Sequence, residues 1–235
     1  MVGYNSKPWI EKSIKSALEQ EHDSFQIVAV DANTTDGTYD ILSEYKDKYP
    51  NKIKLFRNSE RKYPLENACI AVDISDGDIM VSLDFDDWLA HPNVLSVLDR
   101  VYTETNCLMT YGSYADYYDM NGAVQQIDRP RPMYPKEVIN KNSYRKHGWY
   151  CTHLRTFKKT LFNSVDRKEF INPITGKFWD MAGDMAMMFG MIERCDGRFA
   201  AIQDTLYIYN KGNSLSEDRV SIEHQYNCEK IIRGI

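Results

Sequence analysis

Short apolar segments alternate with amphipathic segments over the first 111 residues, and this alternation restricts the fold more than any other feature of the chain. The apolar segments are rich in β-branched residues, whereas the amphipathic ones repeat their hydrophobic residues at helical spacing. Strands that alternate with helices in this way form a mostly parallel sheet with helices on both faces. We expect strands at 25–30, 53–56, 79–83 and 107–111, and helices at 7–20, 39–49, 64–74 and 92–105.

The pattern becomes less regular after residue 111. Asn121 and Gly122 separate two strand-like runs, which predicts a β-hairpin within 114–127. Three prolines follow between residues 129 and 135. Further elements are expected as a strand at 152–157, a helix at 180–194, and strands at 199–202 and 206–209. The second half therefore adds a less regular region to the α/β sheet.

The composition, with 43% hydrophobic and 27% charged residues, is that of an ordinary globular protein. A net charge of −5 and a pI near 5.6 leave no basic footprint for nucleic-acid binding. No stretch reaches the roughly 18–20 apolar residues of a membrane span, and a secretory signal is not recognisable. Five dispersed cysteines without a CxxC pair indicate reduced, mostly buried thiols. We expect a cytoplasmic protein that reaches a membrane only by docking to an acceptor or a partner.

Three carboxylates, Asp84, Asp86 and Asp87, follow the apolar strand expected at 79–83. Charges this close repel one another, and a bound divalent cation, a basic partner or exposure in a turn relieves the repulsion. Ligands of open α/β sheets sit outside the carboxyl ends of the strands, where this run lies. Hard oxygen ligands favour Mg²⁺ or Mn²⁺ over zinc.

A second polar run begins at Asp31, directly after the strand expected at 25–30. In its second half, Asp36 or Thr35 is suited to cap the next helix, and Gly37 eases the turn. Because Asp31 ends a neighbouring strand, the two acidic runs are expected at the same edge of the sheet.

Taken in order, these motifs resemble family 2 glycosyltransferases of the GT-A fold. The resemblance rests on Tyr4-Asn5, VDANTTDGT at 30–38, Arg61 six residues before Asn67, DGDI at 76–79, and LDFDDWL at 83–89. It implies a GT-A, Rossmann-like fold. It also implies a nucleotide-sugar-binding half at 1–111 and an acceptor-binding half with the catalytic base at 112–235.

The resemblance assigns roles to the donor side. Asp31 matches an aspartate that hydrogen-bonds the nucleotide base, and an ionised carboxylate can accept from the imide N–H of uracil. Asp86 matches a direct metal ligand and Asp84 a contact to the ribose or to a metal-bound water. Asp87, outside that match, is suited simply to cap the following helix. The expected cofactor is Mn²⁺ or Mg²⁺. The nucleotide-binding set that follows is Tyr4, Asp31, Asn33, Arg61, Asn67 and Asp84, with Asp86 and Asp84 as metal ligands.

On the acceptor side the resemblance implies a catalytic aspartate at the start of a helix. Asp184 fits this role better than Asp180, which lies one turn earlier, although either is also typical of an ordinary helix N-terminus. Trp149, His153 and Asp180 are weaker candidates for contacts to the donor or acceptor sugar and the diphosphate, with core packing or an interface as the alternative for Trp149 and His153. Lys211 and His224 are further candidates, for a phosphate and for a third metal ligand.

Two departures from the family pattern stand out. Ala32 occupies the place of a usual second aspartate, and only three residues precede Tyr4 where the family has a longer apolar strand. Either the first strand is short, or the start of the chain is truncated.

The expected activity is metal-dependent, inverting transfer from a nucleotide-diphosphate sugar, most simply a UDP-sugar, to a hydroxyl of a glycan, lipid-linked or protein acceptor. One alternative is a non-catalytic module that binds nucleotide sugars or glycans, and another is a structural protein with a fortuitous acidic turn. A sugar nucleotidyltransferase would need a Gly-rich basic loop, and residues 1–20 hold one Gly and no Arg.

Overall fold

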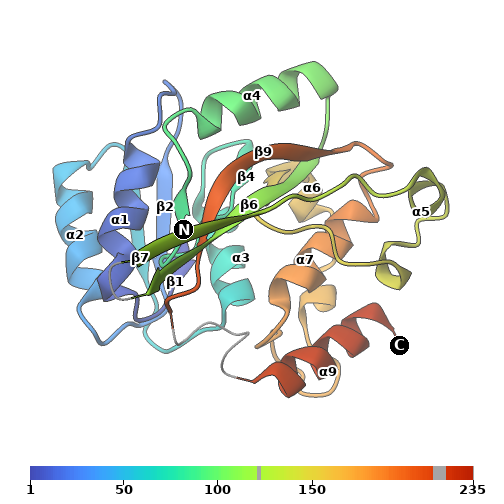
Figure 1. The fold of residues 1–235 in the computed structure, drawn as a ribbon. Helices are drawn as coiled ribbons and strands as arrows, with labels where there is room; N and C mark the ends of the chain where they lie inside the picture. Colours follow the sequence, from blue (N-terminus) through green and yellow to red (C-terminus); the bar gives the residue numbers. More distant parts are fainter. Residues whose placement is uncertain (121–122, 214–220, 235) are drawn as a thin grey trace.

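The computed structural model describes residues 1–120, 123–213 and 221–234. Helices and strands alternate in the first half as the sequence predicts, and α3 begins and ends at the expected residues (Figure 1). The elements are β1 (Val2–Gly3), α1 (Lys7–Leu18), β2 (Ile27–Asp31), α2 (Thr38–Lys48), β3 (Ile53–Arg57), α3 (Pro64–Ile74), β4 (Ile79–Val81), β5 (Trp88–Leu89) and α4 (Val94–Thr105).

A three-stranded parallel sheet in the order β1-β2-β3 forms the first half of the molecule. Helices α1 and α2 lie on one side of this sheet, and α3 packs against β1 and β2 from the other side (Figure 1). This arrangement confirms the α/β fold with helices on both faces. It also brings the carboxyl ends of β2 and β4 to the same edge.

The second sheet has six strands in the order β4-β8-β6-β9-β5, with β7 paired to β6. Its further strands are β6 (Met109–Met120), β7 (Ala123–Arg129), β8 (Thr156–Lys158) and β9 (Phe199–Asn210). Only the β6–β9 pairing is parallel, so the expectation of a mostly parallel sheet holds for β1–β3 and not for this sheet. Parallel strands need a long crossover connection, usually a helix, whereas antiparallel strands do not. In the less regular second half, β6 and β7 follow one another in the chain and pair antiparallel without such a helix.

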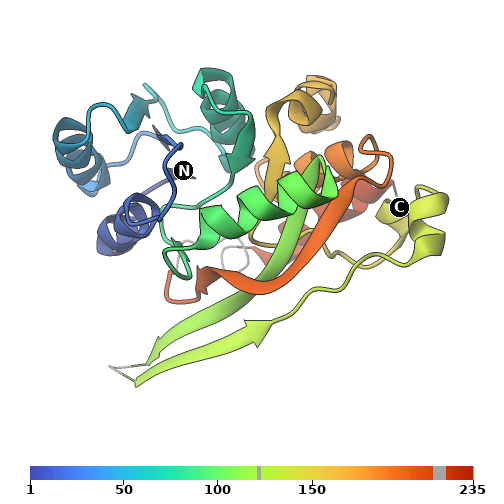
Figure 2. The same ribbon diagram turned by 90° about the horizontal axis from the view of Figure 1, so that it is seen from above.

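The second half contains the predicted hairpin, which extends away from the body of the molecule (Figure 2). Its expected turn residues, Asn121 and Gly122, lie outside the described residues. The strands expected at 199–202 and 206–209 are one continuous strand, β9. The other elements are α5 (Lys136–Asn140), two 3₁₀ helices (Tyr144–Lys146 and Arg167–Phe170), α6 (Lys159–Asn163), α7 (Gly183–Ile192) and α9 (Ile222–Arg233).

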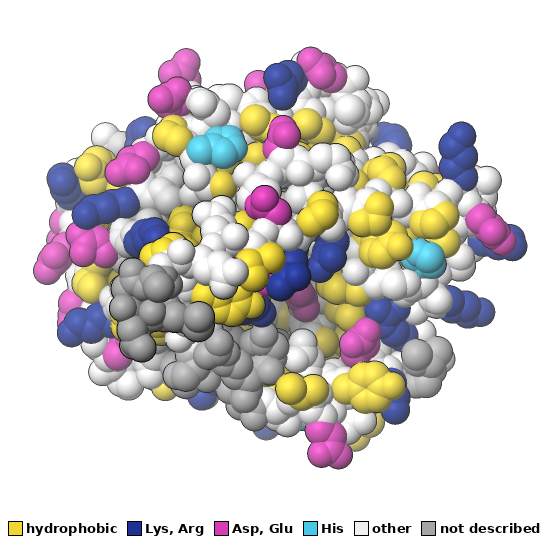
Figure 3. Space-filling view, in the orientation of Figure 1, with side chains coloured by type: hydrophobic (Ala, Val, Ile, Leu, Met, Phe, Trp, Pro, Cys, Tyr) yellow, Lys and Arg dark blue, Asp and Glu magenta, His cyan; other side chains and the backbone are white. Residues whose placement is uncertain are grey.

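Helix α7 lies at the centre of the core of the second half. Apart from Asp184, its residues are buried, and its methionines pack among aromatic side chains as expected of core residues. All five cysteines are buried, and none of them forms a disulfide, which agrees with the expected thiols. None of the helices in the described ranges is long and apolar enough to cross a membrane. Acidic and basic side chains are interspersed over the face seen in Figure 3.

The two sheets meet at Val2. Its N–H donates to the Leu83 carbonyl at 3.2 Å, and its carbonyl accepts from the Phe85 N–H at 3.0 Å. This isolated parallel bridge pairs Val2 with Asp84. The Phe85 side chain is fully buried directly against Gly3, where a Cβ would lie 2.5 Å from the Cβ of Phe85. The acidic segment is therefore anchored to β1 by backbone and side chain together.

Substituting Gly3→Ala is expected to destabilise the protein, because the new methyl group overlaps a buried ring that has no room to move. Overpacking of this kind lowers the free energy of unfolding by about 1–3 kcal/mol. Gly77→Ala is the control, since its nearest neighbour would lie at an ordinary 3.6 Å. Urea denaturation of both variants measures the effect, and equal stabilities would contradict the close approach of β1 to Phe85.

Candidate active site

Asp84, Asp86 and Asp87 lie just after β4, where β1 and β9 converge. Asp84 and Asp86 are half-buried, and Asp87 is buried. Burial and the neighbouring charge of Asp86 raise the pKa of Asp84 to about 6. Burial likewise raises the pKa of Asp86, and burial with the charges of Asp86 and Asp84 raises that of Asp87 well above its ordinary value.

Two residues from the end of the chain's second half hold this acidic run in place. Tyr207 Oη, on β9, lies 2.5 Å from Asp87 Oδ2 and 3.4 Å from Asp84 Oδ2. Asn213 Nδ2 donates to Asp86 Oδ2 at 2.7 Å. No local sequence motif marks either contact, because each joins positions about 120 residues apart.

The prediction that Asp87 caps a helix is wrong. The residues that follow it form strand β5, which pairs with β9, and the next helix begins only at Val94. Asp87 Oδ1 instead accepts from the Asn210 N–H at 2.7 Å. Asp87 therefore positions the acidic run against β9.

Carboxylates with raised pKa values are suited to a divalent cation, since a cation compensates both the mutual repulsion and the lost hydration. The donor set of Asp84 and Asp86 is made of hard oxygens, which fit Mg²⁺ or Mn²⁺. The predicted metal ligands therefore have the chemistry that such an ion requires.

Asp184 opens α7 as predicted and pairs with a buried cation that the sequence analysis did not single out, Arg155. Arg155 is 8% exposed, and its guanidinium also donates to the Cys151 carbonyl. The charges of Arg155 and Asp184 both act on Asp84, so the three groups lie together. The one signal in the sequence was a charged residue in the middle of the strand expected at 152–157.

Asp31 is fully buried at the end of β2. Its Oδ2 accepts from the Thr34 N–H at 3.2 Å and lies 3.4 Å from Arg57 Nε. In the described part of the chain, Asp31 Oδ1 has no hydrogen-bond partner. A buried oxygen without a donor is destabilising unless a ligand or water satisfies it, so this atom is suited to receive an N–H group.

Asn67 lies behind Asp31. Its Oδ1 accepts from Asn58 Nδ2, which also donates to the Asp31 carbonyl at 2.9 Å. Asn67 is 1% exposed, and its Nδ2 donates to the Lys62 carbonyl, so the structure places it where it positions the end of β2.

Tyr4, Arg61 and Asn33 surround the same strand end. The Arg61 guanidinium lies 4.2 Å from the centre of the Tyr4 ring. Asn33 adopts a left-handed backbone conformation, with φ of 65°, and its side chain reaches toward the Ser59 carbonyl. The sequence predicts Asp36 or Thr35 as the N-cap residue of α2, but Gly37 holds that position. Asp36 lies one residue earlier and accepts from the Thr38 N–H and from the Lys7 N–H. Gly37 has the positive φ expected of the turn.

The weaker acceptor candidates are spread over the second half. Trp149 packs edge-on against Phe189 of α7, which agrees with core packing. His153 stacks on Tyr207 with ring centres 4.6 Å apart, which places it beside the acidic run. Burial and the charge of Arg155 lower the pKa of His153 well below its usual value, so the imidazole is neutral.

Asp180 and His224 are hydrogen-bonded at 2.9 Å, and the Cys228 thiol lies 3.9 Å from Asp180 and 3.8 Å from His224. Their possible ligand atoms all lie within 4.8 Å of one another. The hydrogen bond between Asp180 and His224 is sufficient to explain why these atoms lie so close together. Lys211 lies over the Tyr209 ring, next to the stack that contains His153.

Comparison with known proteins identifies the family of the chain. Glycosyl transferase family 2 matches residues 1–166, so the chain belongs to that family. The UDP-Glc:alpha-D-GlcNAc-diphosphoundecaprenol beta-1,3-glucosyltransferase WfaP of Escherichia coli is 28% identical over 118 residues, which are 50% of this chain and 44% of that protein. The chain spans about half the length of the curated relatives it matches first.

Solved structures show the same fold. TarS 1–349 of S. aureus, in complex with UDP, has a TM-score of 0.66 at 17% identity, over 99% of this chain and 63% of that one. Mannosyltransferase PcManGT from Pyrobaculum calidifontis, in complex with GDP-Man and Mn²⁺, has a TM-score of 0.58 at 18% identity, over 99% and 59%. These likenesses confirm the predicted GT-A fold.

Replacing Asp84 by Asn is expected to stabilise the metal-free protein at neutral pH. Because the folded pKa of about 6 lies above the ordinary 3.8, the folded state binds more protons than the unfolded state between these values. Wild-type stability therefore falls as the pH rises through 6. Asn carries no charge, so the variant should gain about 1–3 kcal/mol at pH 7.5.

Thermal unfolding in EDTA at pH 7.5 and near pH 4 measures this difference. The gain should disappear at the lower pH, where the wild-type carboxyl is protonated. A gain of equal size at both pH values would show that the charge of Asp84 is not its cause.

Proposed function

We propose that this chain is the catalytic domain of a metal-dependent, inverting glycosyltransferase that uses a UDP-sugar. Residues 1–111 bind the nucleotide, and residues 112–235 bind the acceptor and supply the base. One observation carries the proposal: Asp84, from the donor half, lies together with the Arg155–Asp184 pair from the acceptor half. A donor-binding group and a candidate base therefore meet in one site, as a direct transfer requires.

The nucleotide base is bound at the end of β2. Asp31 Oδ1 accepts the imide N–H of uracil, which gives a partner to an oxygen that otherwise lacks one. Tyr4 and Arg61 flank this strand end and contact the nucleotide, while Asn33 lines its approach. Asn67 acts indirectly, by holding Asn58 and the end of β2. UDP in the TarS structure supports the choice of base.

Asp86 and Asp84 hold the divalent cation, Mn²⁺ or Mg²⁺. When bound, such a cation neutralises charge that develops on the departing diphosphate. Asn213 orients Asp86, and Tyr207 orients Asp84 and Asp87. The Mn²⁺ in the PcManGT structure supports this assignment.

Asp184 acts as the general base and takes the proton from the acceptor hydroxyl as it attacks the anomeric carbon. Its Oδ2 pairs with Arg155, which fixes the carboxylate, and its Oδ1 accepts from the Met185 N–H at the start of α7. Attack from the face opposite the leaving diphosphate inverts the anomeric centre in a single displacement. No covalent nucleophile is required.

The acceptor is a hydroxyl of a glycan, a lipid-linked glycan or a protein. The name of WfaP specifies a diphosphoundecaprenol-linked sugar, which supports a lipid-linked glycan. His153 and Asp180 lie on the acceptor side, and Trp149 supports that side from the core. A cytoplasmic location, with membrane contact only through the acceptor or a partner, remains our expectation.

Asp86→Asn should abolish the metal-dependent part of UDP binding. The amide keeps the shape of the side chain but removes the charge that holds the cation. We expect Mn²⁺ to strengthen UDP binding to the wild type at least about tenfold, a gain of about 1.4 kcal/mol, and to leave the variant unaffected. Calorimetric titration of UDP with Mn²⁺ or with EDTA measures both affinities. Equal Mn²⁺ dependence in the two proteins would remove Asp86 from the metal site.

Asp184→Asn should lower kcat for UDP release from a UDP-sugar by about 10²–10⁴-fold, because the amide cannot take a proton. UDP·Mn²⁺ affinity should stay within a few-fold of wild type. Asp166→Asn is the matched control, because this exposed aspartate caps a 3₁₀ helix away from the site. Sugar release measured over a panel of UDP-sugars, with stability checked by thermal unfolding, tests the role.

The outcomes separate the alternatives. UDP binding without turnover of any donor would favour a non-catalytic binding module. No binding of UDP by a folded protein would overturn the donor site altogether. Unimpaired turnover by Asp184→Asn would leave the fold assignment intact and remove the base.

A further inference from the structure

Three aromatic side chains of the acceptor half lie together beside the acidic run. Tyr114 on β6, Tyr209 on β9 and His153 contact one another, with ring centres 5.1 to 6.0 Å apart. All three are half-buried, and we call them the aromatic platform. His153 also stacks on Tyr207, whose hydroxyl lies 3.4 Å from Asp84 Oδ2. The platform is therefore one ring away from the candidate active site.

The pairing of β6 with β9 explains why these side chains gather. Tyr114 and Asp116 are two residues apart on β6, and Asp116 pairs with Tyr209 on β9. Side chains alternate between the two faces of a strand, so these three share one face of the sheet. Tyr117 belongs to the opposite face, where its ring lies 4.5 Å from Lys12 of α1. The platform therefore faces away from α1.

Asp116 brings a buried oxygen without a partner to this face. Its side chain is 3% exposed, and its Oδ2 accepts from Arg129 Nε at 2.6 Å. In the ranges that the structure describes, Asp116 Oδ1 has no hydrogen-bond partner, and a hydroxyl group can supply the missing donor. A sugar ring has hydroxyl groups at its edge and apolar C–H faces, which pack against aromatic rings. This face of the sheet therefore has the chemistry of a sugar-binding surface.

Two cations lie over the platform. The Arg131 guanidinium lies 5.5 Å from the centre of the Tyr114 ring, and Lys211 Nζ lies 4.2 Å from the centre of the Tyr209 ring. The charges of both cations act on His153, which lies between these rings. The platform thus combines apolar ring surface with positive charge.

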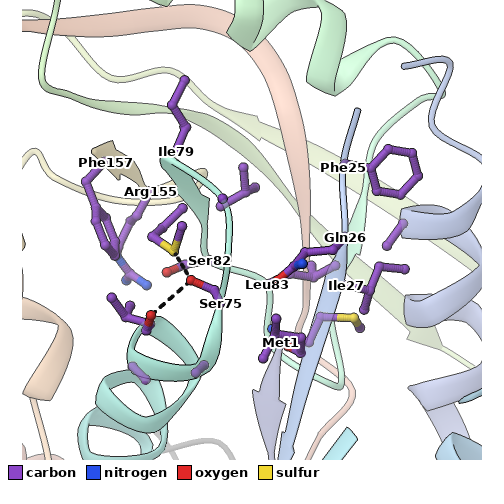
Figure 4. A pocket seen from close by; sticks show the side chains of 18 of the residues that line it. Met1, Phe25, Gln26, Ile27, Ser75, Ile79, Ser82, Leu83, Arg155 and Phe157 are labelled. Carbon is purple, nitrogen blue, oxygen red and sulfur yellow. Dashed lines mark hydrogen bonds between the residues drawn. The ribbon is translucent and has the colours of Figure 1, made fainter. Parts of the chain in front are cut away.

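Arg131 is half-buried and, in the part of the chain that the structure describes, forms no ion pair. Its Nε donates to Thr152 Oγ1 at 3.0 Å, and its Nη2 donates to the Tyr114 hydroxyl at 3.4 Å. Arg155, another cation nearby, already pairs with Asp184 and lines the pocket between β2 and β4 (Figure 4). A guanidinium that is bound only by neutral groups is suited to an anionic ligand.

We propose that the aromatic platform binds the sugar of a phosphorylated acceptor, with Arg131 and Lys211 on the phosphate and Asp116 Oδ1 accepting from a sugar hydroxyl. This inference rests on the function proposed above, because it names the acceptor class for the same site. A guanidinium binds phosphate oxygens through charge-assisted and often bidentate hydrogen bonds. The acceptor class is a saccharide that carries a phosphate or diphosphate ester.

The donor diphosphate is the other candidate ligand for these cations. In the proposed function, that diphosphate already has the divalent cation at the acidic run as its counter-ion. Contacts lead from Arg131 through Tyr114, His153 and Tyr207 before they reach the acidic run. A phosphate at Arg131 therefore belongs to a second ligand, and the position of Arg131 in the acceptor half makes that ligand the acceptor.

Titration of the wild-type chain with a panel of hexose and N-acetylhexosamine 1-phosphates, followed by saturation-transfer NMR, tests the subsite. We expect at least one sugar phosphate to bind at least about tenfold more tightly than its methyl glycoside and than glycerol 3-phosphate. Saturating UDP·Mn²⁺ should leave it bound. No preference over glycerol 3-phosphate would show an anion site only, and displacement by UDP·Mn²⁺ would show that the cations hold the donor; either result would overturn the proposal.

Arg131→Gln should abolish the preference for the phosphate, so that the sugar phosphate and its methyl glycoside bind alike. Asp116→Asn should weaken both probes by a similar factor. Arg167→Gln is the matched control, because this half-buried arginine pairs with Asp73, outside the platform. Thermal unfolding confirms that each variant is folded, and an unchanged preference in folded Arg131→Gln would contradict the proposal.

The same samples separate this inference from the proposed function. Binding of UDP·Mn²⁺ without binding of any sugar phosphate would overturn the subsite and leave the donor site intact. Binding of a sugar phosphate that depends on Arg131, in a protein that does not bind UDP·Mn²⁺, would support the subsite and contradict the donor site.

Discussion

The backbone contact between Val2 and the segment from Leu83 to Phe85 is the interaction on which the rest of the structure depends. It is the only bridge in the described residues between the parallel sheet and the mixed sheet. Asp31, the candidate group for binding the nucleotide base, ends a strand of the first sheet, and the acidic run lies between two strands of the second. Gly3 pairs with Asp31 and packs directly against Phe85, so β1 holds the end of β2 beside the segment that carries Asp84. The relative placement of Asp31 and Asp84 therefore depends on this contact.

Electrostatics explain why the site is built from two halves of the chain. Three carboxylates crowded at one strand end destabilise the folded protein, as their raised pKa values show. Arg155 partly compensates this repulsion, since its positive charge lowers the pKa of Asp84 while it pairs with Asp184. One buried cation thus links the candidate metal ligands to the candidate base. A bound divalent cation would complete the compensation, which makes the ligand-free site the less stable state.

The spacing of hydrophobic residues predicted the helices and strands of the first half, because each of these elements buries its hydrophobic residues in the pattern typical of its type. Helix α3 matched at both ends, since Pro64 begins it and the chain turns after Ile74. The same reasoning placed Asp31 and the acidic run at the same edge, which the structure confirms, but β1 lies between them, with Gly3 beside Asp31 and Val2 beside Asp84. It did not predict that β8 lies between β4 and β6, because the pairing partner of a strand depends on contacts far apart in the sequence.

The site residues that could not be predicted from the sequence also depend on contacts between positions far apart in the chain. Arg155, Tyr207 and Asn213 act through partners 29 to 127 positions away, so no local motif marks them. Asp87 was misread for a related reason: aspartate is a common helix cap, and only the strand pairing of Trp88 and Leu89 shows that no helix follows.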